Sequence, residues 1–319
     1  YDEQGQLVSS TLPGNRTQQT QYDELGNITV TTDSLGNTTT QVWNIFGELT
    51  EVITANGNKH QFDYDANGNT IKEISPSSGI TTYEYDAANQ LIKSTNANGD
   101  YTTYEYDLAG NIIEQYSFAK GSSNAKQRIS YRYDNAGQAL EVKQTGDTHS
   151  THRYHRDALG RVQQESITYG TGDKAFTKQL DYRFDNEGRL ASLIYPDNSK
   201  VTYQYDKGLL KQSTLANGQH ITWNSYQWLA PTQVSYPGAT LKTDYDALLR
   251  PLTINVTGKN NSVLMNRIYQ YTQAGNIGKR QTEKGHINYQ YDPLDRLIEA
   301  KPDQALQALG LPDEGYTYD

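Results

Sequence analysis

Cysteine is absent from this sequence of 319 residues, and hydrophobic residues make up only 34% of it. Without cysteine, a disulfide framework and a thiolate zinc site are excluded. With so few apolar residues, the solid core that a chain of this length would ordinarily build is not expected. The chain still differs from a disordered one, because it has 26 tyrosines and 26 glycines but only 9 prolines. A thin or hollow β structure is the better prediction.

Clustered basic residues and long apolar runs are also lacking. The formal net charge is −9, and proteins that bind nucleic acid normally carry basic patches, so no nucleic-acid partner is expected. We find no signal peptide and no run apolar enough to cross a bilayer, so neither a targeting signal nor a membrane span is expected. Because the chain begins at Tyr1 and its only methionine is Met265, we expect a fragment of a longer chain.

What the sequence does contain is a repeat. A position that is usually aromatic, here called the anchor, recurs every 21 residues in the first third of the chain and every 20 to 28 residues afterwards. A fixed period of this kind is the signature of a repeat architecture. The predicted anchors are Tyr1, Tyr22, Trp43, Tyr64, Tyr85, Tyr106, Tyr133, Arg156, Phe184, Tyr205, Ser225, Tyr245, Tyr271, Tyr291 and Tyr318.

Each repeat carries two turn signals. The first, here called the anchor turn, is Tyr-Asp-x-x-Gly: the aspartate can accept the backbone N–H two residues on, and the glycine can take the left-handed conformation that closes a hairpin. The other, here called the second turn, is Asn-Gly at residues 56–57, 98–99 and 217–218. The residues that best define the repeat are Tyr22, Asp23, Gly26, Tyr64, Asp65, Gly68, Tyr83, Tyr85, Asp86, Tyr104, Tyr106, Asp107, Gly110, Tyr133, Asp134, Gly137, Tyr203, Tyr205 and Asp206.

Some anchor turns depart from this pattern. Asn89 stands where glycine is expected, and asparagine is the next best residue for a left-handed position. Leu229 and Leu249 are not suited to that conformation, and Gly208 comes one residue early, so differently built turns are expected there. Twelve aspartates, Asp206 and Asp319 included, are expected at the same turn position, and turn chemistry then explains the acidic charge.

These signals predict an all-β fold of tandem antiparallel hairpins, one per repeat, because two turns in 21 residues leave two strands of about seven residues. About 14 hairpins over residues 1–319 would form one continuous array, a curved or spiralling single-layer sheet that is a section of a hollow shell. Extra residues are expected in loops on one rim, at Lys120–Lys126, Tyr169–Lys174 and Gly258–Ser262. One helical turn is expected at Asp303–Leu309, capped by Asp303 and ended by Gly310.

Paired tyrosines such as Tyr83 and Tyr85 place two rings on one face of a strand, because the strand period is two. Stacked repeats would align these rings into ladders that stabilise the sheet. The alternative is that rows of rings bind carbohydrate by stacking on sugar faces. Trp223 and Trp228, in a repeat that breaks the pattern, are the better candidates for such an exposed site.

Sites for catalysis are not evident. His149, His152 and His155 with Asp157 form the densest metal-ligand group, but His152 points away from the other two if the segment is a strand. The recurring aspartates each have a local role in a turn, and the sequence has no nucleophile elbow, phosphate loop or dinucleotide fingerprint. We expect no enzyme activity, no cofactor and no metal.

The Tyr-Asp-x-x-Gly anchor turn, the second glycine turn and the Tyr-x-Tyr-Asp close make the chain resemble the Rhs or YD-repeat family. Residues 83–86, 104–110 and 203–206 carry the motif most clearly, and the resemblance spans residues 1–319. It implies a spiralling β-sheet that forms a hollow shell, as in bacterial Rhs toxins, Tc toxin B and C components and, more distantly, teneurins. The absence of cysteine favours a bacterial member.

The resemblance further implies that the chain is a structural wall that encloses a C-terminal toxin polypeptide until delivery. Its partners would be that toxin and further repeats of the parent chain, and its location would be secreted or at the cell surface, exported by a bacterial secretion system. The self-cleaving segment that ends such shells does not occur before Asp319, so no protease residues are carried over. A carbohydrate- or receptor-binding repeat surface is the alternative function.

Overall fold

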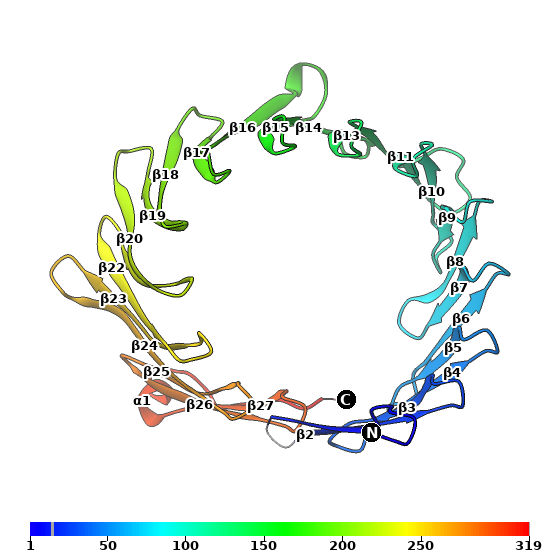
Figure 1. The fold of residues 1–319 in the computed structure, drawn as a ribbon, viewed down its shortest axis with the longest axis horizontal. Helices are drawn as coiled ribbons and strands as arrows, with labels where there is room; N and C mark the ends of the chain where they lie inside the picture. The colour runs from blue at the N-terminus through cyan, green and yellow to red at the C-terminus, as the bar shows by residue number, and fades with distance from the viewer. Residues whose placement is uncertain (14–15, 319) are drawn as a thin grey trace. The chain divides into compact units, whose positions relative to one another are not determined.

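The computed structural model describes residues 1–13 and 16–318. In that part of the chain it has 28 strands, one short helix and one 3-10 turn (Figure 1). The prediction of an all-β fold built from antiparallel hairpins is confirmed.

The strands are β1 (Ser9–Leu12), β2 (Arg16–Tyr22), β3 (Ile28–Thr32), β4 (Thr38–Trp43), β5 (Leu49–Ile53), β6 (Lys59–Tyr64), β7 (Thr70–Ser75), β8 (Gly79–Tyr85), β9 (Leu91–Thr95), β10 (Tyr101–Tyr106), β11 (Ile112–Phe118), β12 (Gln127–Tyr133), β13 (Ala139–Gly146), β14 (Ser150–Arg156), β15 (Val162–Tyr169), β16 (Phe176–Phe184), β17 (Leu190–Ile194), β18 (Lys200–Asp206), β19 (Leu209–Thr214), β20 (His220–Gln227), β21 (Ala230–Ser235), β22 (Ala239–Tyr245), β23 (Pro251–Gly258), β24 (Val263–Tyr271), β25 (Ile277–Thr282), β26 (Gly285–Tyr291), β27 (Leu297–Pro302) and β28 (Glu314–Gly315). The 3-10 turn is η1 (Gly172–Lys174) and the helix is α1 (Gln304–Gln307).

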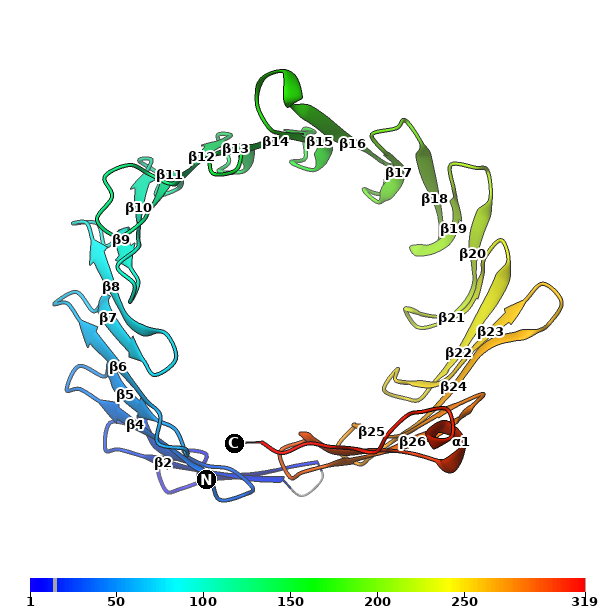
Figure 2. The same cartoon turned by 180° about the vertical axis from the view of Figure 1, so that it is seen from behind.

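The chain divides into two compact units, residues 39–200 and residues 1–38 together with 201–319. In the first unit each strand from β4 to β17 pairs antiparallel with the next strand in sequence. These strands follow one another along an arc in a single layer, as Figures 1 and 2 show. In the second unit β1 to β3 pair in sequence, and so do β18 to β28.

The order of pairing gives each unit two different rims. From β2 onward, each anchor turn joins an even-numbered strand to the next odd-numbered one, and these turns lie on one rim, here called the anchor rim. All second turns lie on the opposite rim, here called the second rim. The loops at 119–126, 170–175 and 259–262 are on the second rim, as predicted.

The anchors that lie in strands sit at β-bulges. In the β10–β11 pair, for example, Glu105 lies opposite Glu114 but Tyr106 lies opposite Ile112, so one residue of β11 is skipped. Eleven other hairpins shift at the residue before the anchor in the same way, for instance β6–β7 and β26–β27. Because a bulge bends its strand and increases the local twist, a bulge in every hairpin curves the sheet.

The predicted left-handed turn positions are confirmed. Gly110 has a φ of 85°, Asn89 has a φ of 61°, and the other predicted anchor-turn glycines also have positive φ. The expectation of a different turn at Leu249 is wrong: Leu249 itself takes a φ of 58° and donates its N–H to the Asp246 carbonyl, as glycine does elsewhere. The Asp246 carboxylate holds the turn in this conformation, because it accepts hydrogen bonds from the N–H groups of Leu248 and Arg250.

The two other exceptions are differently built, as predicted. Asp206 pairs with Leu209 across a two-residue turn with positive φ at Lys207 and Gly208, so Asp206 ends a strand and is not in the turn position expected for it. Gln227 likewise pairs with Ala230 across a two-residue turn. Two-residue hairpin turns need positive φ to match the twist of the strands. Asp319 lies outside the described residues.

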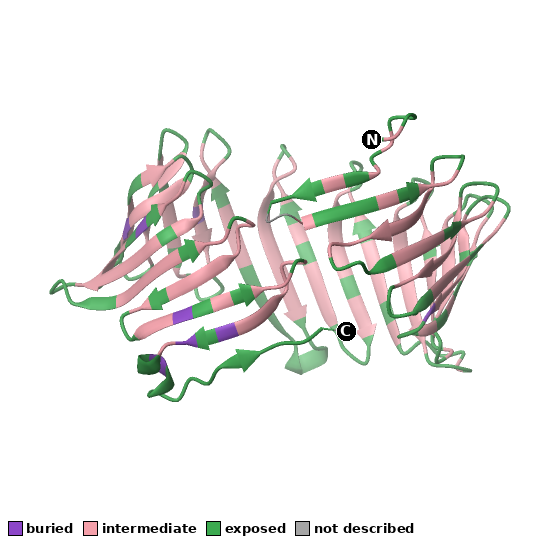
Figure 3. Cartoon of the chain, turned by 90° about the horizontal axis from the view of Figure 1, so that it is seen from below, coloured by how far each residue is buried: buried purple, intermediate pink, exposed green. Residues whose placement is uncertain are grey.

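Burial confirms that the sheet is thin. Among the described residues, only Val234, Ile287, Ala300 and Leu306 are buried hydrophobics, and most strand positions are partly exposed on both faces (Figure 3). A small core lies where α1 contacts β26 and β27, with Leu306 packed against Ile287 and Ala300.

That helix is formed as predicted. Its N-cap Asp303 accepts a hydrogen bond from the Leu306 N–H at 3.0 Å, and Gly310 follows it with a φ of 91°. Gly285 must lack a side chain, because a Cβ there would lie 2.4 Å from the Asp303 carboxylate. No described helix is long and apolar enough to span a membrane.

We predict that Gly110→Val lowers the free energy of unfolding by about 2 kcal/mol, because a side chain at a left-handed position costs roughly 1–2 kcal/mol and a β-branched one costs more. Space is not the limit, since an added Cβ would meet only the flexible Gln90 side chain at 3.4 Å.

The matched control is Gly238→Val, in a second turn where φ is not positive and nothing lies within 4 Å of an added Cβ. Urea denaturation followed by circular dichroism measures both variants. Equal losses in the two would contradict the conformational explanation.

Candidate functional site

The anchor turn is the structural unit that recurs along the chain. Asp107 shows the geometry: one carboxylate oxygen accepts the backbone N–H groups of Ala109 and Asn111, each at 2.9 Å. The backbone adds two bonds, from the Asp107 N–H to the Asn111 carbonyl at 2.9 Å and from the Gly110 N–H to the Asp107 carbonyl at 3.1 Å. The predicted role of the anchor-turn aspartates as acceptors is therefore confirmed here. The same pattern occurs at Asp2, Asp23, Asp65, Asp86, Asp134, Asp157, Asp185, Asp246 and Asp292.

The residue four positions after the aspartate completes the turn, and the sequence analysis missed it. The second carboxylate oxygen of Asp107 accepts from the Asn111 amide at 3.0 Å. Arg161, Arg189, Arg250 and Arg296 bind the aspartate of their own turns in the same way, with Nε–oxygen distances of 2.6 to 2.8 Å. The signal was the recurrence of asparagine or arginine at this spacing.

These arginines also reach the next repeat. The Arg161 guanidinium lies 4.4 Å from the centre of the Phe184 ring, Arg250 lies 4.3 Å from Tyr271, and Arg296 lies 4.6 Å from Tyr318. In each case the ring is the anchor of the following repeat. One arginine thus joins its own turn to its neighbour through a cation–π contact.

The anchor hydroxyls make the other contact between repeats. The Tyr106 hydroxyl donates to the Leu91 carbonyl at 2.7 Å, and Leu91 is two residues past the left-handed residue of the preceding turn. The backbone ladder between β9 and β10 has already ended at the Lys93–Thr103 pair, so the hydroxyl supplies a partner where the strands separate. The same donor and acceptor pairs occur at Tyr22–Leu7, Tyr64–Leu49, Tyr85–Thr70, Tyr133–Ile112, Tyr226–Leu210, Tyr245–Pro231, Tyr271–Pro251, Tyr291–Ile277 and Tyr318–Leu297.

This bond corrects one predicted anchor. Ser225 was expected to be the anchor of its repeat, but Tyr226 makes the hydroxyl bond, to the Leu210 carbonyl. Two register shifts in β20, on either side of Ser225, move the anchor by one residue. The sequence spacing alone did not reveal this shift.

Two anchors without a hydroxyl show what the position requires. Arg156 donates from its guanidinium to the Ala139 carbonyl at 3.3 Å, which replaces the tyrosine bond. Phe184 cannot donate, and there the Arg161 cation–π contact joins the two repeats. Both substitutions keep a link to the preceding repeat.

The tyrosines two positions before the anchor form a row across neighbouring repeats. Tyr104 is close enough to Tyr83 and to Tyr131 to influence the ionisation of both hydroxyls. Burial is the main cause that raises the pKa of Tyr83 and Tyr131; for Tyr83 the Glu73 carboxylate comes next and Tyr104 is a smaller cause, whereas for Tyr131 Tyr104 comes next. Tyr131 also stacks on Tyr133, with ring centres 6.4 Å apart.

The histidine group does not converge. His152 lies in β14 between Val142 and Ile167 on the adjacent strands, whereas His155 lies opposite Gln164 and is exposed. Among the described residues there is no group of three or more histidine or carboxylate side chains arranged to hold a metal ion.

The aromatic side chains do gather at one groove on the second rim. The rings of Tyr101 and Phe118 stack with centres 4.5 Å apart, and the groove beside them has a volume of about 250 Å³. Asn96, Asp100 and Lys126 contribute polar atoms to its walls. Of the two tryptophans singled out from the sequence, Trp228 is 84% exposed and Trp223 is half-buried.

Comparison with known proteins agrees with this geometry. The family model described as the teneurin YD-shell matches residues 1–159 and 69–208, which together cover more than half of the chain. The chain therefore belongs to the YD-shell family, and its role is that of a structural shell protein. No curated protein sequence matches the chain.

Solved structures match over most of the chain. A TcdB2–TccC3–Cdc42 crystal structure superposes with a TM-score of 0.76 at 19% identity, over 90% of this chain and 17% of that one. A Tc holotoxin pore from Photorhabdus luminescens gives a TM-score of 0.75 at 18% identity, over 90% of this chain and 16% of that one. The chain thus has the fold of a section of these Tc toxin structures and spans about a sixth of their length.

We predict that Tyr106→Phe lowers the free energy of unfolding by about 1 kcal/mol, because it removes the hydroxyl bond and leaves the Leu91 carbonyl without this donor. Tyr236→Phe is the control, since Tyr236 is 44% exposed and its hydroxyl makes no described hydrogen bond. Thermal and urea unfolding measure both. If the two variants are equally stable, the bond between repeats contributes nothing.

We also predict that stability declines at both ends of the pH range. The side-chain amide four residues on, together with the backbone N–H groups, lowers the pKa of Asp23, Asp65 and Asp107. Their contribution is complete above the unfolded pKa of about 3.9 and is lost as the pH falls through the lower folded pKa. Burial raises the pKa of Tyr85 and Tyr106, so stability is also lost as the pH rises past about 10.

Melting temperatures measured from pH 2 to pH 11 test both limbs. Asp107→Asn keeps an oxygen for the turn N–H groups but removes the titrating group, so its acid limb is expected to be shallower than that of the native chain. A melting temperature that is constant below pH 4 would contradict the role of the aspartates.

Proposed function

We propose that this chain is a section of the wall of a hollow shell that encloses a toxin polypeptide until delivery. The observation that carries the proposal is that most described repeats are joined to the next by recurring contacts of the anchor residue, with very few buried hydrophobic residues. A wall of this kind has two solvated faces and can surround a volume, because its repeats need only their neighbours for stability.

The comparisons support this function by likeness. The matched structures are of Tc toxin components, and the chain has their fold over 90% of its length. Under this proposal the chain acts outside the cell that makes it, secreted or at a cell surface, exported by a bacterial secretion system. Its partners are the enclosed polypeptide and further repeats, and it has no catalytic role of its own.

Protease protection tests the enclosure. In the complete polypeptide to which this chain belongs, we expect the enclosed segment to resist a broad-specificity protease in the native protein. The doubly destabilised variant Tyr106→Ala with Gly110→Val opens the wall and makes that segment at least about tenfold more sensitive, since a loss of more than 1.4 kcal/mol changes an opening equilibrium tenfold.

Tyr236→Phe is the matched control and leaves protection unchanged. A segment that is digested at the same rate in the native protein and in the opened variant would rule out enclosure, even if the wall itself is intact by circular dichroism.

A carbohydrate-binding surface is the second candidate function, favoured by the groove beside Tyr101 and Phe118. Stacked rings flanked by amide, carboxylate and ammonium groups are suited to a sugar, which presents an apolar face and a polar edge. A glycan array with the native chain and with Tyr101→Ala distinguishes the two functions. Binding that disappears in the variant would establish this surface, and no binding by the native chain would exclude it.

A further inference from the structure

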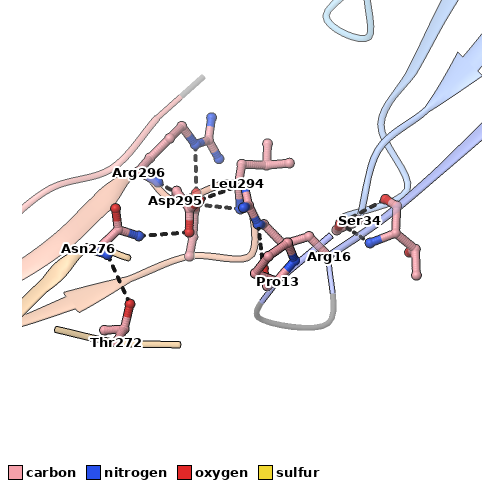
Figure 4. Close-up of polar contacts among 10 residues, drawn as sticks. Pro13, Arg16, Ser34, Thr272, Asn276, Leu294, Asp295 and Arg296 are labelled. Carbon is pink, nitrogen blue, oxygen red and sulfur yellow. Dashed lines mark hydrogen bonds and ion pairs between the residues drawn. The ribbon is translucent and has the colours of Figure 1, made fainter. Parts of the chain in front are cut away.

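One contact in the unit of residues 1–38 and 201–319 brings the two rims together. The Arg16 guanidinium forms an ion pair with the Asp295 carboxylate at 2.5 Å (Figure 4). Arg16 begins β2 and so follows a second turn, whereas Asp295 is in the anchor turn between β26 and β27. A second-rim segment from one end of the sequence therefore rests on an anchor-rim turn from the other end.

Both partners of this ion pair are held in place. Arg16 also donates through Nε to the Pro13 carbonyl at 3.0 Å, and Asp295 also accepts from the Asn276 amide at 2.8 Å (Figure 4). The side chains of Arg16 and Asp295 are only 23% and 25% exposed. The pair is thus fixed by a second contact on each side, unlike a flexible surface ion pair.

The next second turn contributes to the same contact. The Ser34 hydroxyl accepts from the Thr17 N–H and donates to the Thr17 carbonyl, both at 2.8 Å, which joins the two second turns. The pKa of Asp33 is lowered. Partial burial of Asp33 opposes its ionisation, but the hydrogen bonds that it accepts from Asn37 and Leu35, and to a smaller extent the charge of Arg296, outweigh this effect. The second rim therefore presents the Arg16 cation to the Asp295 carboxylate, and the Ser34 hydrogen bonds hold the next second turn beside Thr17.

The exposed fraction of leucine side chains in the anchor turns differs between the docked turn and the others. Leu25, Leu159 and Leu248, in the central positions of their turns, are 73% to 78% exposed. Leu294 has the same kind of position, beside Asp295, and is only partly exposed (Figure 4). The anchor turn with a second-rim segment against it has thus lost apolar surface that comparable turns expose.

In the same unit, two earlier anchor turns, separated from the docked one by the turn at 272–276, are apolar and uncovered. Trp228, Leu229 and Leu248 are 84%, 78% and 73% exposed, and the Gln227 amide joins their two turns by donating to the Asp246 carbonyl at 3.4 Å. These three residues are here called the Trp228 patch. Adjacent large apolar residues with this exposure mark an interaction surface rather than scattered surface hydrophobics.

We infer that the anchor rim is a docking surface for the second rim of YD repeats, and that the Trp228 patch takes the second turns of a second copy of this chain. The contact between Arg16 and Asp295 is the model for it, continued along the same rim. Because the two rims differ, the association is head-to-tail and is not a two-fold symmetric pairing. The inference concerns how sections of wall stack, and it stands whether or not the wall encloses a toxin.

A measurement of self-association tests directly whether the Trp228 patch binds a second copy of the chain. We expect the native chain to form dimers and larger assemblies with rising concentration in sedimentation velocity, up to about 100 μM, the weak range expected for a small apolar contact. Trp228→Ser with Leu229→Ser and Leu248→Ser should remain monomeric over the same range. Val42→Ser is the matched control, because Val42 is 44% exposed but lies within β4 and in neither kind of turn.

Site-specific cross-linking identifies the occupant. The chain has no cysteine, so Leu248→Cys can carry a single benzophenone maleimide, and mass spectrometry locates the captured residues. Second-turn residues of another molecule, such as 54–58 or 96–100, are expected. The same label at Leu294→Cys should capture residues near Pro13 and Arg16 of its own molecule.

Three results would overturn the inference: a native chain that stays monomeric at 100 μM, capture by Leu248→Cys of residues that are not in second turns, or no capture near Pro13 by Leu294→Cys. Capture of an unrelated segment would assign the patch to another partner. None of these results depends on protease protection, so failure of stacking and failure of enclosure are distinguishable.

Discussion

The anchor hydroxyl that donates to a carbonyl of the preceding repeat is the contact on which this sheet depends. A bulge in every hairpin separates neighbouring repeats near the anchor turn, and the backbone ladder between them ends early, as at Lys93 and Thr103. Carbonyl groups left there would need a partner. The anchor hydroxyl supplies one, as from Tyr106 to the Leu91 carbonyl. Curvature and cohesion between repeats therefore come from the same residue.

This dependence explains how the anchor varies. Arginine is accepted at residue 156 because its guanidinium reaches the Ala139 carbonyl, and phenylalanine is accepted at residue 184 because Arg161 packs on its ring. What is kept is a link across the gap rather than a tyrosine. With so few buried hydrophobics in the described residues, stability is close to a sum of such nearest-neighbour links.

The features that could be predicted from the sequence are those set by local chemistry. The left-handed turn residues, the aspartate acceptors and the cap at Asp303 each depend on a few adjacent residues, and their patterns were visible. The hydroxyl bonds were not predicted, because Tyr106 and Leu91 belong to different repeats and their contact depends on the bulge. The rings were expected to stack on one another, but the recurring contacts of the anchors are to carbonyls and arginines.

The errors have the same origin. Leucine at residue 249 adopts a left-handed conformation against its preference because the Asp246 carboxylate and two backbone bonds fix the turn around it. The anchor moves from residue 225 to Tyr226 because register shifts in β20 change the count. In both cases the surrounding structure outweighed what the local sequence predicted: the conformational preference of leucine at residue 249, and the repeat spacing at residue 225.

The same constraints divide the two rims into different roles. Most anchor turns keep one length, because the bulge, the aspartate contacts and the hydroxyl bond occur together, and their two central residues vary most; the turns after Asp206 and Gln227 depart from it and span two residues. Some second turns have the same carboxylate contacts, as at Asp33, but all three long loops are inserted on this rim. Changes on the second rim therefore alter shape and length, whereas changes on the anchor rim alter mainly surface chemistry, from the polar Ala66–Asn67 to the apolar Ile45–Phe46 and Trp228–Leu229. The anchor turns have regular spacing but variable polarity, so their central residues can determine which partner binds the anchor rim. The loops of the second rim vary in length, so their shape can determine which anchor turns they fit.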